Sequence, residues 1–421
     1  MKHYLIGLTA VLLICFFGIC ACSGDTHYAA TNMLSVEPYT SWENAASNIQ
    51  WAADAATEGD TVLVSNGVYE AGGLTNYPTG TLLTNRLVIT SAITVTSVNG
   101  ASVTAIKGAW ASNGQTNGLD SVRCVYMSAG TLIGFTITNG ATRVSSSADG
   151  NGGGIYCPST SPGIPPVISN CVIAGNAAYY YGAGVYYGTM CNTIVKNNNG
   201  NNSVAARGVI IYHGNAVNCT ISNNSGGGSM VGYSVLSNCA VVNNASVSGA
   251  GGVQNCNLAN CLIAVNSGNL ASVTINESGY WIKNSTIVSN YCANSNVGGG
   301  MYFTVGKTAT VENCVIYDNH FKNLHSIEGA GGIFTNCCVF PTNSSAILAG
   351  SVNNIESDPQ FANKAAGDWR LKAGSPCVNA GINRDWMTNS VDLDGTARLR
   401  YGRVDMGAYE CIYSGTICGF R

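Results

Sequence analysis

The stretch Asn170-Cys171-Val172-Ile173-Ala174-Gly175-Asn176 decides the fold, because the chain repeats it. Close copies occupy residues 218–224, 238–244, 260–266, 284–290 and 313–319, and degenerate copies occupy residues 191–197 and 336–339. Equivalent positions lie 20 to 29 residues apart, with a mean of about 24. Internal repetition at such a period is typical of solenoid proteins.

Each copy has the pattern of a short strand followed by a turn. Cys171 and Ile173 are two residues apart, so their side chains lie on the same side of a strand. We expect Asn176 and its equivalents to be the turn residues with positive φ, because Asn tolerates that conformation. Glycines precede a second short apolar strand, as in Gly182-Ala183-Gly184-Val185-Tyr186. The sequence therefore predicts a parallel β-solenoid, since a propeller blade needs roughly 40 residues and no helical patterning runs from 150 to 340.

The repeat also predicts a column of buried cysteines. Stacked rungs place equivalent residues about 4.8 Å apart. The expected column is Cys171, Cys219, Cys239, Cys261, Cys314 and Cys337. We expect these thiols to act as small hydrophobic groups, because no CxxC spacing supports a metal or redox column. A disulfide between Cys411 and Cys418 is an open alternative to free thiols in the tail.

Composition agrees with a chain that turns often and exposes few charges. Charged residues make up 9% of the 421 residues, where about 25% is usual. The chain contains 52 Gly and 47 Asn. Its net charge of -3 argues against nucleic acid as a partner, because such a partner requires a basic surface. Hydrophobic residues at 46% are enough for a core.

The N-terminus is typical of an export signal. Lys2 is followed by an almost continuous apolar run over residues 4–21, so we expect residues 1–21 to be a signal peptide. A membrane anchor is the alternative. Ile19-Cys20-Ala21-Cys22 resembles a bacterial lipoprotein box in which Cys22 would be acylated, with signal-peptidase cleavage nearby as the alternative.

The two ends of the solenoid require caps. Thr40-Ser41-Trp42-Glu43 fits a helix capping box, and apolar residues at helical spacing run from Trp42 to Ala56. We expect this helix to cover the first rung, whose first strand would be residues 61–64. Residues 356–421 hold 16 of the 39 charged side chains, so we expect a separate C-terminal module there and a β-helix over residues 28–355.

The body resembles the right-handed parallel β-helix repeats of the pectin-lyase-like superfold, and its Asn-Cys-x-Ile-x-x-Asn units are similar to those of polymorphic outer-membrane proteins. The tail resembles the choice-of-anchor Q module. Its matching segments are Asp358-Pro-Gln-Phe361, residues 368–376, Asn379-Ala-Gly381, residues 392–395 and residues 404–410. These resemblances imply an all-β fold, a right-handed parallel β-helix with an N-terminal α-helical cap and a small C-terminal module. They imply an exported surface or extracellular protein without fixing one activity.

Enzymes of this superfold cleave polysaccharides, but the middle rungs of this chain lack the acidic side chains that such catalysis uses. Glycosidases use two carboxylates, and the lyases use acidic Ca²⁺ ligands with an Arg or Lys base. Residues 150–311 hold one acid, Glu277. The candidate catalytic cluster is Glu312, Asp318, His320, His325 and Glu328, together with Lys322. Acid, imidazole and amine groups together suit proton transfer or metal binding, and a solvated loop is the alternative.

Two further candidates are a calcium site and a sugar-binding surface. Asp392 and Asp394 resemble the start of a calcium loop but lack the downstream acid, so a structural turn is the alternative. Aromatic rings suit the apolar faces of sugars. The candidate ligand-binding residues are Tyr179, Tyr180, Tyr181, Tyr186 and Tyr187, with strand packing as the alternative.

We therefore expect an exported, non-catalytic β-helix that binds a polysaccharide or cell-surface glycan, or adheres through one long face. The alternatives are a polysaccharide lyase or glycoside hydrolase, and a structural spacer without a ligand. We expect a bacterial extracellular, cell-surface or outer-membrane location and a monomer. No cofactor is expected, with Ca²⁺ as the alternative.

Overall fold

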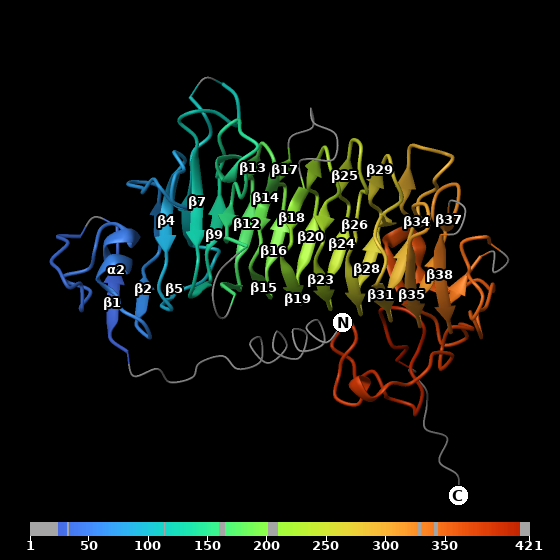
Figure 1. The fold of residues 1–421 in the computed structure, drawn as a ribbon. Coiled ribbons are helices and arrows are strands. Elements are labelled where there is room, and N and C mark those ends of the chain that lie inside the picture. The colour runs from blue at the N-terminus through green and yellow to red at the C-terminus, as the bar shows by residue number, and fades with distance from the viewer. Residues whose placement is uncertain are drawn as a thin grey trace, which may run out of the picture. The chain divides into compact units, whose positions relative to one another are not determined.

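The computed structural model describes residues 24–31, 33–112, 114–159, 165–200, 209–326, 330–340 and 344–412. The chain forms two compact units, residues 1–256 (unit 1) and 257–421 (unit 2). Each unit is built from short parallel strands that stack rung upon rung into sheets (Figure 1). Within the described residues no helix is both long and apolar enough to cross a membrane.

Unit 1 contains four parallel sheets. Sheet A consists of β1 (Thr26–Ala29), β2 (Thr61–Val64), β5 (Thr94–Ser97), β8 (Thr131–Ile133), β11 (Val167–Ser169), β15 (Thr189–Cys191), β19 (Asn215–Val217) and β23 (Val235–Ser237). Sheet B consists of β3 (Gly67–Tyr69), β6 (Thr104–Lys107), β9 (Thr136–Thr138), β12 (Val172–Ala174), β16 (Ile194–Lys196), β20 (Thr220–Ser222) and β24 (Ala240–Val242). Sheet C consists of β4 (Thr84–Ile89), β7 (Val122–Met127), β10 (Ile155–Tyr156), β14 (Tyr181–Tyr186), β18 (Val209–Tyr212), β22 (Val231–Gly232) and β26 (Val253–Gln254). Sheet D consists of β13 (Ala177–Ala178), β17 (Asn199–Gly200), β21 (Ser225–Gly226) and β25 (Ala245–Ser246). A short 3₁₀ turn, η1, spans Ala148–Gly150.

Unit 2 continues the same pattern and then carries a non-repetitive module. Its sheet A strands are β27 (Asn257–Ala259), β31 (Tyr280–Lys283), β35 (Thr308–Glu312) and β38 (Gly331–Thr335). Its sheet B strands are β28 (Leu262–Ala264), β32 (Thr286–Val288), β36 (Val315–Tyr317) and β39 (Cys338–Val339). Its sheet C strands are β30 (Val273–Ile275), β34 (Met301–Phe303) and β37 (Leu324–Ser326), and its sheet D strands are β29 (Ser267–Gly268) and β33 (Tyr291–Cys292). The module contains the antiparallel pair β40 (Phe361–Asn363) and β41 (Asp368–Leu371), with 3₁₀ turns η2 (Lys364–Ala366) and η3 (Asp385–Met387).

The core is built from columns of apolar residues, one from each rung. In sheet B of unit 1 the register aligns Ile137, Ile173, Val195, Ile221 and Val241. All five are fully buried, whereas the residues flanking Ile173 are half-buried. The strand alternation that the motif predicts is thereby confirmed.

The turns use a different Asn from the one expected to have positive φ. Asn170, the first residue of the motif, has a φ of 52°, and Asn218 has a φ of 53°. At the end of the motif Gly175 has a φ of 68°, whereas Asn176 is not in the left-handed region. The expectation for Asn176 was therefore wrong, because its side chain is needed inside the solenoid.

Asn176 and its equivalents form a buried asparagine ladder. In unit 1 the side-chain Nδ2 of Asn176 donates to Oδ1 of Asn198 at 3.0 Å, Asn198 donates to Asn224 at 3.0 Å, and Asn224 donates to Asn244 at 2.9 Å. Each Oδ1 also accepts the backbone N–H of the preceding ladder residue. All four side chains are 1% exposed. In unit 2 Asn266, Asn290 and Asn319 repeat the arrangement.

The ladder also corrects the alignment of one degenerate copy. The sequence motif places Asn197 in line with Asn176, but Asn198 is the ladder residue. Thr193, whose Oγ1 accepts the N–H of Cys171 at 3.4 Å, takes the position of the cysteine in this rung. The sequence motif therefore placed this rung one residue too early.

The predicted cysteine column is present in each unit as buried thiols. Cys171, Cys219 and Cys239 are at most 2% exposed, as are Cys261, Cys314 and Cys337 in unit 2. Thirteen cysteines of the described residues, Cys411 among them, are buried thiols outside any disulfide. Cys418, the alternative partner of Cys411, lies outside the described residues. Burial raises the pKa of Cys171 to about 11, so this thiol stays protonated and unreactive at neutral pH.

The N-terminal cap contains a helix that is shorter than the sequence predicts. Helix α2 spans Ile49–Ala55, and its N-cap is Asn48, whose side chain accepts the N–H of Gln50. The predicted capping box at Thr40 was wrong, because the segment before Asn48 pairs with the sheet instead: Ala46 bridges to Ala29. Strand β1 precedes the helix, so β2 is the second strand of sheet A rather than the first.

The C-terminal module is docked on the turns of unit 2 through the first Asn of each motif. Asn260 donates to the carbonyl of Val391 at 3.0 Å, and Asn336 donates to that of Ala380 at 2.9 Å. Asn313 both donates to and accepts from the backbone of Ile382. These Asn side chains are at most 3% exposed.

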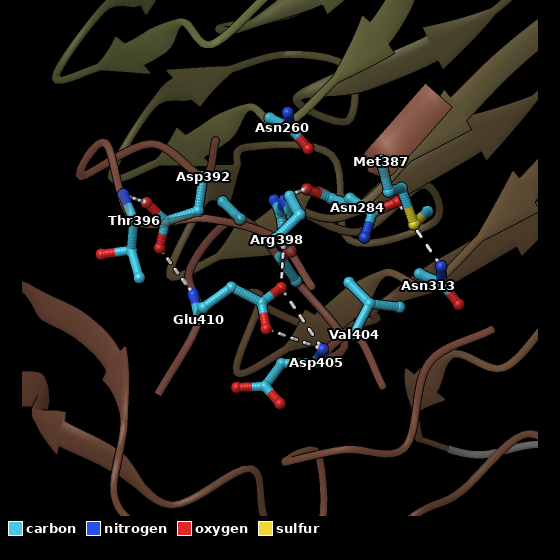
Figure 2. A network of polar contacts seen from close by, with 12 residues as sticks. Asn260, Asn284, Asn313, Met387, Asp392, Thr396, Arg398, Val404, Asp405 and Glu410 are labelled. Carbon is cyan, nitrogen blue, oxygen red and sulfur yellow. Dashed lines mark hydrogen bonds and ion pairs between the residues drawn. The ribbon is translucent and has the colours of Figure 1, made fainter. Parts of the chain in front are cut away.

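A buried ion pair lies at the centre of this contact. Figure 2 shows Arg398 between Asn284 and Glu410. The guanidinium donates to Oε1 of Glu410 at 2.8 Å and to the carbonyl of Asn284 at 3.3 Å. Burial raises the pKa of Glu410 to about 7 and also raises the pKa of Asp405, despite the opposing charge of Arg398.

Replacing a ladder residue is expected to destabilise unit 1. Asn198→Ala removes the acceptor of the Asn176 N–H, which then lies buried without this partner. We expect the free energy of unfolding to fall by about 2–3 kcal/mol, measured from the urea midpoint. Asn199→Ala, at the exposed neighbouring position, is the control. Equal midpoints for the two variants would contradict a structural role for the ladder.

The stability of unit 2 is expected to fall as pH rises toward neutrality. Because the pKa of Glu410 is raised from 4.5 to about 7, the folded state binds a proton more tightly than the unfolded state between these values. The urea midpoint should therefore decline between about pH 5 and about pH 7 and then level off. Glu410→Gln should flatten the decline, and Glu277→Gln, at an exposed position, should retain it. A decline of the same size in Glu410→Gln would show that another group is responsible.

Candidate functional site

Tyrosines form a stacked column on the outer side of sheet C in unit 1. The parallel register aligns Tyr126, Tyr156, Tyr186 and Tyr212, one on each rung. Their ring centroids lie 5.9, 4.9 and 5.7 Å apart, with interplanar angles of 11°, 14° and 13°. The repeat thus converts one tyrosine per rung into a continuous stack.

A second aromatic column is formed by the position that comes one residue after the first column in the sequence of each rung. Tyr187, His213 and Tyr233 have φ values of 60°, 56° and 55°, so they lie in the left-handed turns after the strands. Their rings stack at 4.8 and 5.0 Å. Tyr187 and His213 each also contact Tyr212 edge-on, which joins the two columns.

The accessible part of this surface is what we call the tyrosine face. Tyr126 and Tyr156 are 6% and 7% exposed, so the column is buried at its first rungs. The tyrosine face comprises the half-buried residues Tyr181, Tyr186, Tyr187, Tyr212, His213 and Tyr233. Burial raises the pKa values of Tyr186 and Tyr187, so both hydroxyls are protonated at neutral pH and can donate hydrogen bonds.

A buried arginine supports the first rungs of the column. Arg123 is fully buried, and its guanidinium lies 4.7 Å from the centre of the Tyr156 ring. It donates to Oδ1 of Asn85 at 2.6 Å and to the carbonyls of Gly152 and Asn151 at 2.9 and 2.8 Å. Burial lowers its pKa to about 10, which still leaves it charged at neutral pH. One cation thereby ties strand β4 and the loop before β10 to the aromatic stack.

The rungs that carry the tyrosine face are almost uncharged. Residues 165–256 contain two charged residues, Lys196 and Arg207, and residues 209–256 contain none. The surface therefore offers hydroxyls, amides and aromatic edges to a ligand, without carboxylates.

Three of the five tyrosines proposed from the sequence lie on this face. Tyr181 stacks on Tyr212 at 4.2 Å. Tyr180 contacts Tyr181, also at 4.2 Å, and the backbone N–H of Tyr179 donates to Thr142, so both lie beside the stack. The sequence argument missed Tyr212, His213 and Tyr233. A signal was present, since each lies at or just after the end of an apolar strand at the repeat spacing. The rung of Tyr212 and His213 lacks the glycine run that marks Tyr156 and Tyr186, and in the rung of Tyr233 the run at residues 226–228 is separated from the strand by Ser229 and Met230.

The two described acids of the proposed catalytic cluster, Glu312 and Asp318, are each paired with a basic residue of the C-terminal module. The carboxylate of Glu312 is paired with the guanidinium of Arg384. The carboxylate of Asp318 lies 2.6 Å from Nζ of Lys364. Both acids thus bind basic residues of the C-terminal module. These basic residues are distant in the sequence, so the local pattern around residues 312–328 did not reveal the pairing.

The described side chains of His320 and Lys322 make other contacts. His320 stacks on Tyr291 at 4.3 Å, and its Nδ1 is 3.3 Å from the carbonyl of Cys292. Lys322 donates to the carbonyl of Asn296 at 3.3 Å. His325 is in β37, and Glu328 lies outside the described residues.

The candidate calcium ligands have the geometry of a structural turn. Oδ1 of Asp392 accepts the N–H groups of Asp394 and Thr396 at 2.9 and 2.7 Å, and Oδ2 accepts that of Glu410 at 2.7 Å (Figure 2). Both oxygens of Asp392 are therefore occupied by backbone donors. Across the part of the chain that the structure describes, no group of three or more His, Cys, Asp or Glu residues could hold a metal ion. Cys22, the proposed lipidation site, lies outside the described residues.

Substitution of Arg123 tests whether this cation supports the aromatic stack. Arg123→Lys keeps the charge but cannot reach the acceptors that the guanidinium fork spans. We expect a loss of about 3–5 kcal/mol in unfolding free energy, because buried acceptors lose their donors. Arg143→Lys, where a half-buried guanidinium binds the carbonyl of Leu119, is the control. A loss no larger than that of the control would contradict the supporting role.

Comparison with known proteins adds information about the fold. No family model and no curated protein matches the chain. The solved structure of pectate lyase Pel9A is similar over 92% of this chain and 96% of its own, with a TM-score of 0.51 and 15% identity. A rhamnogalacturonan lyase is similar over 86% of this chain and 97% of its own, with a TM-score of 0.41 and 13% identity. XylC in complex with xylose is similar over 80% of this chain and 87% of its own, with a TM-score of 0.40 and 11% identity.

At this level of identity the likeness to Pel9A concerns the fold and carries no activity with it. The predicted parallel β-helix is confirmed by the parallel sheets of each unit and by this likeness. The chain has the right-handed parallel β-helix fold seen in pectate lyase.

Proposed function

We propose that this protein is an exported, non-catalytic β-helix that binds a neutral polysaccharide along the tyrosine face of unit 1. The observation that carries the proposal is an aromatic surface that continues from rung to rung on a part of the chain almost free of charge.

The stacked geometry determines which atoms meet the ligand. Neighbouring rings cover each other's faces, so the tyrosine face presents ring edges and hydroxyls. Tyrosine hydroxyls donate and accept hydrogen bonds, as the hydroxyls of sugars do. The ring edges add apolar contact with the C–H groups of a sugar. This combination suits a polyhydroxylated ligand better than a purely apolar one.

The absence of charge selects a neutral polymer. An acidic polysaccharide would bring carboxylates to a surface where residues 209–256 offer no Lys or Arg. Desolvating those carboxylates without cationic partners would cost free energy. A neutral glycan avoids that cost.

The repeat suits a polymer rather than a single sugar. Equivalent side chains recur about every 4.8 Å along the stack, so successive sugar units meet similar groups. Several weak contacts on one chain then add through their high effective concentration. Binding should therefore strengthen with the length of the oligosaccharide.

The same surface lacks the groups for cleavage. Hydrolysis of a glycosidic bond normally requires two carboxylates, and residues 165–256 contain no Asp or Glu. Glu312 and Asp318 are engaged with Arg384 and Lys364. The apolar segment at residues 4–21 supports export, to the cell surface or the extracellular space, as part of this proposal.

Two variants test the proposal by isothermal titration with a panel of soluble neutral and acidic polysaccharides. Tyr212→Phe keeps the ring and removes one hydroxyl, so affinity should fall by about threefold to tenfold. Tyr187→Ala removes a ring from the turn column, so affinity should fall by about tenfold. Tyr291→Ala, which is 48% exposed and lies in unit 2, is the control.

We expect binding to a neutral polymer that these two variants weaken and the control does not. Preference for an acidic polymer, or equal affinity in all four proteins, would overturn the proposal. Circular dichroism of each variant shows whether the fold is retained.

A further inference from the structure

Unit 1 contains a pocket that the tyrosine face does not explain. It has a volume of about 530 Å³ and lies between the N-terminal cap and the first rungs. This volume falls within the range of small-molecule sites. The pocket is lined by residues of α2, β3, β4 and β6, so the sheets and the cap build it together.

The apolar side chains in the pocket wall differ in exposure. Ile49, Leu87 and Ile106 line it and are 3%, 0% and 0% exposed. Val68 and Met33 also line it and are 54% and 36% exposed, so they lie at its mouth. Met33 and Val68 therefore supply apolar surface that a ligand can contact, and an aliphatic body covers that surface without losing hydrogen bonds to water.

The polar part of the pocket contains Arg86, which interacts electrostatically with Glu70 but forms no ion pair with a described carboxylate. Nε of Arg86 donates to the carbonyl of Lys107 at 2.9 Å, and Nη1 donates to the carbonyl of Gly72. These bonds fix the guanidinium but do not neutralise it. Among the described residues no carboxylate lies within ion-pair distance of Arg86.

The one acid that lines the pocket is already paired. The carboxylate of Glu70 lies 2.6 Å from Nζ of Lys107. Glu70, Lys107 and Arg86 together therefore carry a net charge of +1, and Arg86 supplies the unbalanced part. A half-buried guanidinium with free N–H groups is a strong partner for a carboxylate.

We propose that this pocket binds an amphiphilic carboxylate, with the carboxylate on Arg86 and an aliphatic body against Met33 and Val68. The ligand differs in chemistry from the neutral polysaccharide of the tyrosine face, and the site does not depend on that function. A single-chain carboxylic acid of medium length combines one negative charge with an apolar body of this kind.

The experiment is isothermal titration of the protein with octanoate. Three further probes separate the two parts of the recognition: acetate has the charge without the body, octyl glucoside has the body without the charge, and galacturonate has the charge on a polar body. We expect octanoate to bind and the other three to bind at least about tenfold more weakly. Equal binding of octyl glucoside, or tighter binding of galacturonate, would overturn the assignment.

Variants place the binding in this pocket. Arg86→Gln should weaken octanoate binding by at least about tenfold, because it removes a charge-assisted hydrogen bond. Arg86→Lys should retain part of the affinity. Val68→Trp should block the mouth and abolish binding without touching the charge. Arg143→Gln, another half-buried arginine that binds a loop carbonyl, should bind octanoate as the unmodified protein does.

Unfolding temperatures of the ligand-free variants show whether each retains its fold, and Val68→Trp keeps the test decisive if Arg86→Gln is unstable. No octanoate binding by the unmodified protein, or undiminished binding by both Arg86→Gln and Val68→Trp, would contradict the proposal. Polysaccharide binding measured in parallel should not change in either variant, so this site and the tyrosine face can fail separately.

Discussion

Each turn of this β-helix must satisfy buried backbone N–H groups where the chain changes direction, and the asparagine ladder does so. An Oδ1 such as that of Asn198 accepts both the backbone and the side-chain N–H of the preceding rung. Its own Nδ2 donates onward to Asn224. Because every amide is both donor and acceptor, the ladder extends through the rungs without leaving a polar group unpaired. The columns of apolar residues and of tyrosine rings depend on this register.

The two asparagines of the motif have separate roles. The second, such as Asn176, is buried and holds one rung to the next. The first, such as Asn170 or Asn313, takes the left-handed conformation that turns the chain. In unit 1 Asn170, Asn192 and Asn218 are exposed, whereas in unit 2 Asn260, Asn313 and Asn336 bind the backbone of the C-terminal module. The first asparagine of the motif is therefore exposed to solvent in these rungs of unit 1, whereas in unit 2 it binds the C-terminal module.

Sequence reasoning predicted the solenoid because the repeat and the strand alternation are local patterns. It did not distinguish the two asparagines, since both tolerate positive φ and only burial separates them. It placed the start of the helix too early, because Ala46 pairs with Ala29 across a distance that helical spacing does not reveal. The cluster around Glu312 and Asp318 looked catalytic because its partners, Arg384 and Lys364, lie at least 46 residues away in the chain.

The candidate site could be predicted only in part for a similar reason. Tyr181, Tyr186 and Tyr187 stand together in the sequence, but Tyr212 and Tyr233 join them only through the parallel register of successive rungs. The pocket at Arg86 gave no sequence signal, because its walls come from the cap and three strands. Four points stay predictions: export, the signal peptide at residues 1–21, the location of the protein, and the role of the tail at residues 356–421.

The proposed function requires that the tyrosine face binds a polysaccharide without cleaving it. The most direct test is to incubate residues 23–421 with the neutral polysaccharides that they bind, with calcium and with a chelator, and to follow polymer length. We expect retention of the polymer by the protein and an unchanged length distribution under both conditions. Shortened polymer, with or without calcium, would contradict the account and identify the protein as a polysaccharide-cleaving enzyme.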